Sequence, residues 1–559
     1  MLQPLRNNPN RQSVVRAITY SASVEGWDAI SPLAAMKELR AVQLKNWFPQ
    51  PGYLEVRRGY QVYARLAAST IPIQSLMVYH GLSTTADKLF AAANGNIYDT
   101  SNPSAALSVQ CTWGAGIWGV DTWGAPLLTS LASNRWQWVN YSNTGANYLY
   151  IVNGSDAAHA YNGTSWTTPT ITGVSSTDLV HVNSHQRRLW FCQNNSTKAW
   201  YLGTDSISGA ATAFELGSFF TKGGYLNAMA TWTVDAGAGP DDYAVFISSR
   251  GQCAVYHGTD PSSSTTWALV GVYDLPAPIG RRCFVKYGGN LLLLTVSGLL
   301  QLNLALQSDS AQVQTTAITQ RIDTAFNTAA RLFKDNFGWD VTVYAKGTRM
   351  FVNIPTSELI SAKQYVMNTI TGAWCEYDNH NAACWAVYKD RIFFGGVDGA
   401  VYEADTTSAD KLTPITATGQ TAYKADVSPG NLKRFTMIQP LVVTSGSTRP
   451  SVGISTDFNE TATLSTPSGA AAATSLWDAA VWDTAIWGGG SSYVSDWTSS
   501  SGLGRWASVK FQASTGTNAS GMLWGTGQWG VDTWGESNVS EETIQVNGFV
   551  VLAEVGAYV

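Results

Sequence analysis

Residues 89–99 have the sequence LFAAANGNIYD, a short apolar run, an Asn-Gly turn and a second run with β-branched and aromatic residues. Asn-Gly between two such runs is the usual signature of a tight β-hairpin. The same order recurs in residues 148–163 (YLYIVNGSDAAHAYNG), 246–258 (FISSRGQCAVYHG), 291–304 (LLLLTVSGLLQLNL) and 392–404 (IFFGGVDGAVYEA). Repeated hairpins are typical of propeller blades, and their irregular spacing favours a distorted β-propeller. The alternative is a β-sandwich or several small sheets.

The composition also favours a mainly β fold. Charged residues make up 13% of the 559 residues, about half of the usual share in soluble domains. The chain contains 23 Trp, 24 Tyr and 51 Gly. Such a composition suits short strands, tight turns and large aromatic contacts. The length predicts about two to four domains.

Three regions follow from changes in pattern along the chain. We predict an extended N-terminal arm over 1–65, a β-propeller-like domain over 66–440 and a Trp/Gly/Ser-rich β domain over 441–559. The arm contains GWDAISPLAAM (26–36) and NWFPQPGYLEVRRGY (46–60), whose prolines break any long helix. The last region contains runs that alternate well enough for a small β-sandwich, namely MIQPLVVTS, RWASVKFQAS and TIQVNGFVVLAEV.

One segment departs from the β pattern. Residues 317–335 have the sequence AITQRIDTAFNTAARLFKD. Its apolar residues recur at helical spacing: Ile318, Ile322, Ala325, Phe326, Ala329, Leu332 and Phe333. We predict an amphipathic helix inserted between two blades and packed against the sheet, with partner binding as the alternative.

Tryptophan recurs every five positions in three segments. These triplets are Trp113, Trp118 and Trp123; Trp477, Trp482 and Trp487; and Trp524, Trp529 and Trp534. A period of five matches neither a strand nor a helix, so we expect chains of tight turns with the rings along one side. The triplets are candidates for core packing or a subunit interface, and the alternative is a sugar-binding platform.

Two of these segments also contain a GxGxxG pattern, beginning at Gly114 and at Gly525. A dinucleotide site needs a strand before this pattern and a helix after it. Here further Trp-Gly turns follow, so we exclude a nucleotide site and expect no cofactor.

The charge and the cysteines limit the partners. The net charge is −5 and there is no dense Lys/Arg run, so only transient, non-specific contact with DNA is expected. The six cysteines have no metal-type spacing and are expected to be reduced and mostly buried. Neither a signal peptide nor an apolar stretch long enough to span a bilayer is present.

No catalytic motif stands out in the sequence. His181 and His185 lie close together in HVNSH, without the HExxH pattern of zinc proteases, and we expect surface or hydrogen-bonded histidines. G-x-S-x-G and P-loop motifs and an Asp-rich calcium loop are absent. We therefore predict neither enzyme activity nor a metal site, with a glycoside hydrolase as an alternative because two carboxylates placed by the fold would suffice.

Two stretches resemble the nozzle, or tail hub, proteins of short-tailed bacteriophages, also called packaged-DNA stabilisation proteins. The first is GWDAISPLAAM followed by NWFPQPGYLEVRRGY, and the second runs from the helix over 317–335 to YVMNTITGAWCEYD (365–378). The resemblance implies a distorted β-propeller in a hexameric tube below the portal and adaptor rings of the virion. Such a tube conducts DNA, carries a distal needle or plug and tail fibres or spikes, and retains the packaged genome. The subunit would assemble in the host cytoplasm.

Five residues of the predicted arm are candidate interface residues, because aromatic and arginine side chains are enriched at interface hot spots: Trp27, Trp47, Phe48, Arg57 and Arg58. The alternative for Trp47 and Phe48 is that they seal the propeller. A different function, carbohydrate binding by a propeller or sandwich on the virion surface, remains open at this point.

Overall fold

The chain folds into two compact units. The sandwich unit comprises Met1–Gly59, Thr371–Glu376 and Thr407–Val559, and the propeller unit comprises Tyr60–Ile370 and Tyr377–Thr406. The computed structural model describes residues 14–66, 71–101, 126–235, 240–308, 312–411, 413–425, 430–445, 448–459, 462–467, 492–515 and 542–558. The unit boundaries differ from the predicted regions because strands from both ends of the chain join the same unit.

The propeller unit is a succession of small antiparallel sheets. In chain order the described sheets are β7 (Ser75–Tyr79), β8 (Lys88–Ala93) and β9 (Asn96–Asp99); β10 (Gln137–Ser142), β11 (Asn147–Val152), β12 (His159–Tyr161) and β13 (Trp166–Thr167); β15 (Leu179–His185), β16 (Arg188–Gln193), β17 (Lys198–Tyr201) and β19 (Thr212–Glu215); β20 (Leu226–Asp235), β21 (Pro240–Ser248), β22 (Gln252–Gly258) and β23 (Trp267–Asp274); β24 (Phe284–Tyr287), β25 (Asn290–Thr295) and β26 (Gly298–Gln301); β27 (Asp340–Tyr344), β28 (Arg349–Ser357) and β29 (Ser361–Asn368); and β31 (Ala382–Tyr388), β32 (Arg391–Gly396) and β33 (Ala400–Ala404). A short parallel pair, β14 (Ile171–Thr172) and β18 (Gly209–Ala210), lies outside them.

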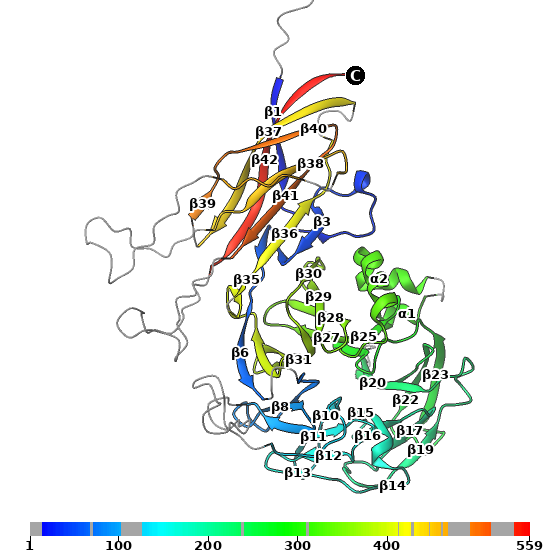
Figure 1. Ribbon diagram of the computed structural model, residues 1–559. Helices are drawn as coiled ribbons and strands as arrows, with labels where there is room; N and C mark the ends of the chain where they lie inside the picture. The colour runs from blue at the N-terminus through cyan, green and yellow to red at the C-terminus, as the bar shows by residue number, and fades with distance from the viewer. Residues whose placement is uncertain are drawn as a thin grey trace, which may run out of the picture. The chain divides into compact units, whose positions relative to one another are not determined.

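These sheets form a closed ring (Figure 1). The first strand of each sheet contacts the first strand of the next, from β7 through β10, β15, β20, β24 and β27 to β31, which contacts β7 again. The sheet of β31 is completed by β6 (Tyr60–Arg65), which pairs antiparallel with β33. The two ends of the unit are therefore joined by backbone hydrogen bonds, and the predicted β-propeller is confirmed.

The predicted hairpins are confirmed as well. Between β8 and β9, Ala93 pairs with Asn96, which leaves Asn94 and Gly95 as a two-residue loop with φ of 51° and 69°. Positive φ at both positions defines the type I′ turn that Asn-Gly favours. The other four predicted hairpins are β11–β12, β21–β22, β25–β26 and β32–β33.

The inserted helix lies between β26 and β27. Short helical segments, α1 (Leu302–Ala305), η3 (Val313–Thr316) and η4 (Ile318–Ile322), precede α2 (Asp323–Phe333). Phe326 is fully buried and its ring lies 6.0 Å from that of Trp339, and Tyr365 of β29 donates a hydrogen bond to the backbone oxygen of Ala325 at 3.3 Å, so core packing against the sheet is confirmed. Leu332 was predicted on the buried face but is 60% exposed. Within α2 the buried face is formed by Phe326, Ala329 and Ala330, and Leu332 projects about 120° away from Phe326 at 100° per residue.

Two sheets contain most of the described strands of the sandwich unit. The first contains β1 (Val14–Ser21), β4 (Trp47–Gln50), β5 (Tyr53–Val56), β37 (Asn431–Thr444), β39 (Ser492–Val494), β40 (Thr498–Gly504) and β42 (Ile544–Tyr558). The second contains β2 (Gly26–Trp27), β3 (Arg40–Lys45), β36 (Thr416–Thr421), β38 (Ser451–Thr456) and β41 (Ala507–Ser514), and Glu376 of β30 (Trp374–Tyr377) pairs with Lys45 of β3. The Phe511 ring of the second sheet lies 5.3 Å from Trp47 and 5.0 Å from Phe549 of the first. These contacts form the core of the predicted β-sandwich.

The segment predicted as an N-terminal arm contributes strands to both sheets of this sandwich. β1 pairs along its whole length with β42, from Val14 opposite Val555 to Ser21 opposite Gly548. β3 pairs with β36. Residues 14–21 are therefore integrated with the last described strand, and both ends of the described chain contribute to this sandwich.

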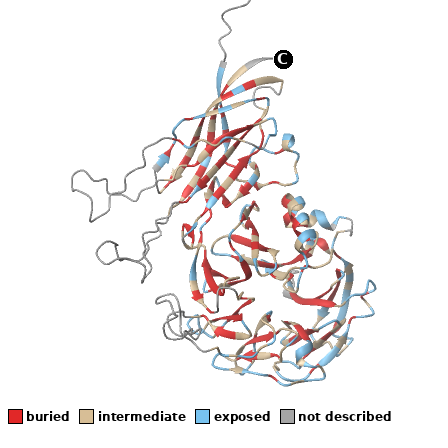
Figure 2. Ribbon diagram, in the orientation of Figure 1, coloured by how far each residue is buried: buried red, intermediate tan, exposed pale blue. Residues whose placement is uncertain are grey.

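Burial follows the strands of both units (Figure 2). Five cysteines are buried and free, as predicted: Cys192, Cys253, Cys283, Cys375 and Cys384. Cys111 lies outside the described residues. Among the described helices none is long and apolar enough to cross a membrane.

Candidate functional site: the axial cavity of the propeller

Three cavities follow one another along the innermost strands of the propeller. The central cavity, of about 500 Å³, is lined by residues of β7, β10, β15, β20, β24, β27 and β31. A second cavity of about 410 Å³ shares Gln137, Arg281 and Arg282 with it and lies where these strands begin. A third, of about 290 Å³, shares Lys286 and lies where they end. We call the three together the axial cavity. Its N-terminal end is the 410 Å³ part, where the innermost strands of the sheets begin.

Arg282 ties several sheets together at this cavity. Its Nη2 donates hydrogen bonds to the backbone oxygens of Gln74 (3.3 Å) and Trp136 (3.2 Å) and to Ser75 Oγ (3.0 Å). Its Nη1 lies 3.7 Å from Asp340 Oδ2, at the start of β27. Burial raises the pKa of Asp340 to about 6, and the nearby Arg282 opposes that rise. The pair therefore crosslinks the first strands of the ring.

The two neighbouring histidines have the same role between β15 and β20. His181 Nε2 donates to the backbone oxygen of Met229 at 2.9 Å. Thr231 Oγ1 donates to Ser184 O at 2.7 Å, so it accepts the hydrogen bond from His185 Nδ1 at 3.2 Å. Surface or hydrogen-bonded histidines were predicted, and the structure shows hydrogen-bonded ones that are not at the surface. Burial lowers the pKa of both rings to about 4, so both are neutral at pH 7.

These histidines make stability depend on pH. The folded pKa of His185 lies below the usual value near 6.5, so the unfolded chain binds more protons and stability falls as pH drops from about 6.5 to 4. His185 is 2% exposed, and we expect its share of this loss to be on the order of 3 kcal/mol. Asp340 acts in the opposite direction, since its raised pKa makes stability fall as pH rises through 6.

Urea denaturation at several pH values measures this dependence. The slope between pH 6.5 and 4 should flatten in His185→Gln, and it should stay unchanged in His80→Gln, because the His80 side chain is 62% exposed. An equal slope in His185→Gln and the wild-type chain would contradict the assignment.

The predicted interface residues are divided by burial. Trp47 and Phe48 are fully buried in the sandwich unit, and Arg57 is 2% exposed. These three side chains stabilise the chain's own core and are not available to a partner in this structure. Trp47 and Phe48 seal the sandwich rather than the propeller. Trp27 is half-buried and Arg58 is exposed, and an interface role for these two stays a prediction.

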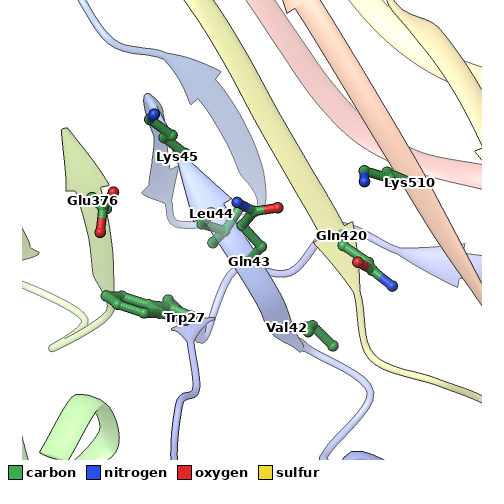
Figure 3. Close-up of a pocket in the computed structure, with 8 residues that line it drawn as sticks. All are labelled: Trp27, Val42, Gln43, Leu44, Lys45, Glu376, Gln420 and Lys510. Atoms are coloured by element: carbon green, nitrogen blue, oxygen red, sulfur yellow. The ribbon is translucent and has the colours of Figure 1, made fainter. Parts of the chain in front are cut away.

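Trp27 lines a pocket of about 290 Å³ in the sandwich unit (Figure 3). Gln43, Gln420 and Lys510 lie opposite one another on three adjacent strands of its wall. Leu44, Val42, Lys45 and Glu376 complete the lining. An indole beside amide, carboxylate and ammonium groups makes this a polar pocket with one aromatic wall.

The three tryptophan triplets lie outside the described residues, and their role stays a prediction. Within the described part of the chain, no group of three or more His, Cys, Asp or Glu side chains is placed to hold a metal ion. Asp242 lies in β21, where its Oδ1 accepts a hydrogen bond from Thr233 Oγ1 at 2.6 Å.

The charged residues of the axial cavity were not predicted as site residues from the sequence. Arg281 and Arg282 form a pair in IGRRCF just before β24, and Asp340 begins β27 in FGWDV. Paired arginines directly before an apolar strand are a usable signal, because arginine is costly to bury without partners.

Comparisons with known proteins give only remote likenesses. No protein-family model matches the sequence, and no curated protein matches it. An exo-β-1,3-galactanase from Phanerochaete chrysosporium is 12% identical over 74% of this chain and 95% of its own, with a TM-score of 0.24. YCF48 from Cyanidioschyzon merolae is 11% identical over 61% and 98%, with a TM-score of 0.33. Raptor from Chaetomium thermophilum is 10% identical over 62% and 29%, with a TM-score of 0.35. Values this low support no inference about function.

The class of the protein therefore follows from its own structure. It is a mainly β protein with a β-propeller unit, an inserted helix and a β-sandwich unit.

Proposed function

We propose that this chain is a structural protein of a bacteriophage tail, the nozzle subunit that the sequence resemblance implies. Six copies would form a tube below the portal and adaptor that conducts DNA and helps to retain the genome. The first resembling stretch, 26–60, supplies β2 to β5 of the sandwich unit. The second, 317–378, supplies α2 and β27 to β30.

The observation that carries the proposal is that polar side chains along the propeller axis form hydrogen bonds between neighbouring sheets. Arg282 bonds backbone oxygens and Ser75 of neighbouring sheets, and His181 and His185 bond β20 from β15. Side chains that are hydrogen-bonded between sheets keep the ring rigid. A rigid ring suits a subunit whose task is shape, and buried aromatic clusters at its blade junctions, such as Trp190 on Trp267, stabilise that ring.

The low charge is a second support. With a net charge of −5, the subunit attracts the DNA backbone weakly, and a conduit needs DNA to slide rather than bind.

Native mass spectrometry of the purified full chain over a range of concentrations tests this proposal. We expect an assembly with six times the 60.1-kDa mass of one chain, formed by the chain alone or after addition of the adaptor protein. A chain that stays monomeric in both conditions and hydrolyses a cell-surface polysaccharide would refute the proposal.

A second candidate function, carbohydrate binding, is favoured by the Trp27 pocket of the sandwich unit. Sugar rings stack on aromatic faces while their hydroxyls bond amides and carboxylates, and Figure 3 shows Trp27 together with Gln43 and Glu376 in one pocket. Glycan-array binding by the wild-type chain that Trp27→Ala abolishes would favour this alternative.

A further inference from the structure

We propose that the N-terminal end of the axial cavity binds a small oxyanion of the phosphate class through Arg281 and Lys334. This proposal does not depend on a role in a phage tail. It concerns a cavity of about 410 Å³ whose charged lining residues are Arg135, Arg281, Arg282, Lys334 and Asp335.

Two of the four cations already have carboxylate partners. Arg282 lies 3.7 Å from Asp340 and Arg135 Nη2 lies 2.7 Å from Glu358 Oε1. Their charges are therefore largely balanced by neighbours, and they shape the cavity wall without supplying a free positive charge.

Arg281 differs from both. It has no ion pair among the described residues, and its contacts are a long hydrogen bond from Nη2 to Asn194 Oδ1 (3.5 Å) and the face of the Tyr225 ring, 5.9 Å away. Its Nη1 is buried and has no hydrogen-bond partner within the described part of the chain. Desolvating a charge without a counter-charge is costly, as is burying a donor such as Nη1 without an acceptor. An anion in the cavity would relieve both costs.

Lys334 lines the same cavity immediately after α2. It is exposed and forms no ion pair with any described residue. Asp335 beside it is the carboxylate of this lining, and it is also exposed, so water screens its repulsion of an incoming anion. The cavity thus combines a partly buried guanidinium, whose Nη1 is buried, with an exposed ammonium.

The chemistry of these two groups selects the ligand. A guanidinium presents a planar fork of N–H donors that matches two oxygens of a phosphate or carboxylate. Lys334 adds a point charge from a different part of the lining, and a tetrahedral oxyanion has oxygens left to meet it after the fork is filled. The weak Arg281–Asn194 bond is one that a charged acceptor can replace.

Isothermal titration calorimetry with inorganic phosphate tests the site, with sodium chloride and sodium acetate at the same ionic strength as comparison ligands. Saturable binding of phosphate to the wild-type chain is expected, weakened at least about tenfold in Arg281→Gln and about threefold or more in Lys334→Ala. Lys346→Ala, an exposed lysine in the β27–β28 turn outside this cavity, should bind phosphate like the wild type.

Lys334→Ala keeps the test decisive if Arg281→Gln fails to fold, because Lys334 is exposed and has no ion-pair partner in the described structure. Absence of saturable phosphate binding, unchanged affinity in Lys334→Ala, or an equal response to chloride would each overturn the proposal. Tighter binding of acetate than of phosphate would overturn the assignment of the ligand class.

Discussion

Replacing Arg57 with alanine should destabilise the sandwich unit by about 3–5 kcal/mol, since it leaves a buried carboxylate without its partner. Arg57 is 2% and Asp410 3% exposed. The guanidinium donates to both oxygens of Asp410, at 2.8 and 2.6 Å, and its Nε donates to Asn46 Oδ1 at 2.8 Å. No water can replace these donors without opening the core.

Hydrogen exchange measured by mass spectrometry reports this loss in the sandwich unit separately, which matters because a chain with two units need not unfold in one step. Peptides from β3 and β36 should lose protection in Arg57→Ala. Arg58→Ala is the matched control, since Arg58 is the exposed neighbour, and it should change stability by less than about 0.5 kcal/mol. In a double-mutant cycle with Asp410→Asn, we expect strong coupling of about 1–3 kcal/mol. Equal protection in Arg57→Ala and Arg58→Ala would contradict a structural role for the pair.

Replacing Trp190 with alanine should cost the propeller unit about 3–5 kcal/mol, because the change removes a large buried ring and leaves a cavity. Trp190 is 1% exposed and lies in β16. Its ring stacks on Trp267 of the next sheet, with centroids 5.6 Å apart and planes 16° from parallel, and contacts Phe246 at 5.5 Å. The Trp190 ring thus holds two adjacent blades together.

Thermal unfolding of the variant, followed by calorimetry, measures the effect. Trp190→Phe should recover part of the loss because a smaller ring still fills much of the site. Ile370→Ala, in the same unit but 70% exposed, should remain within about 0.5 kcal/mol of the wild type. If Trp190→Ala and Ile370→Ala unfold at the same temperature, aromatic packing between blades does not stabilise the ring.

Local features of the fold could be predicted from sequence, whereas the strand pairings between distant segments of the chain could not. The hairpin over 89–99 was predictable because its turn and both strands are neighbours in the chain. The pairing of β6 with β33, and of β1 with β42, joins segments from opposite ends of a unit or of the chain. No local pattern specifies such partners, and so 1–65 was predicted as an arm.

The candidate site shows the same division. The sequence context of His181 and His185 predicted surface or hydrogen-bonded histidines, and it could not choose between them because their bonds to Met229 and Thr231 depend on which blade lies next. Trp47, Phe48 and Arg57 have the composition of an interface hot spot and lie in the core instead, because aromatic rings and paired arginines serve both purposes equally well. Sequence alone does not distinguish these two uses.

The most direct test of the account is electron microscopy of the purified chain, alone and with the adaptor protein that the proposed function implies. The account predicts class averages with six-fold rings that enclose a central channel, in which each subunit shows a propeller and a sandwich. Isolated particles the size of one chain under all conditions, without rings, would contradict it.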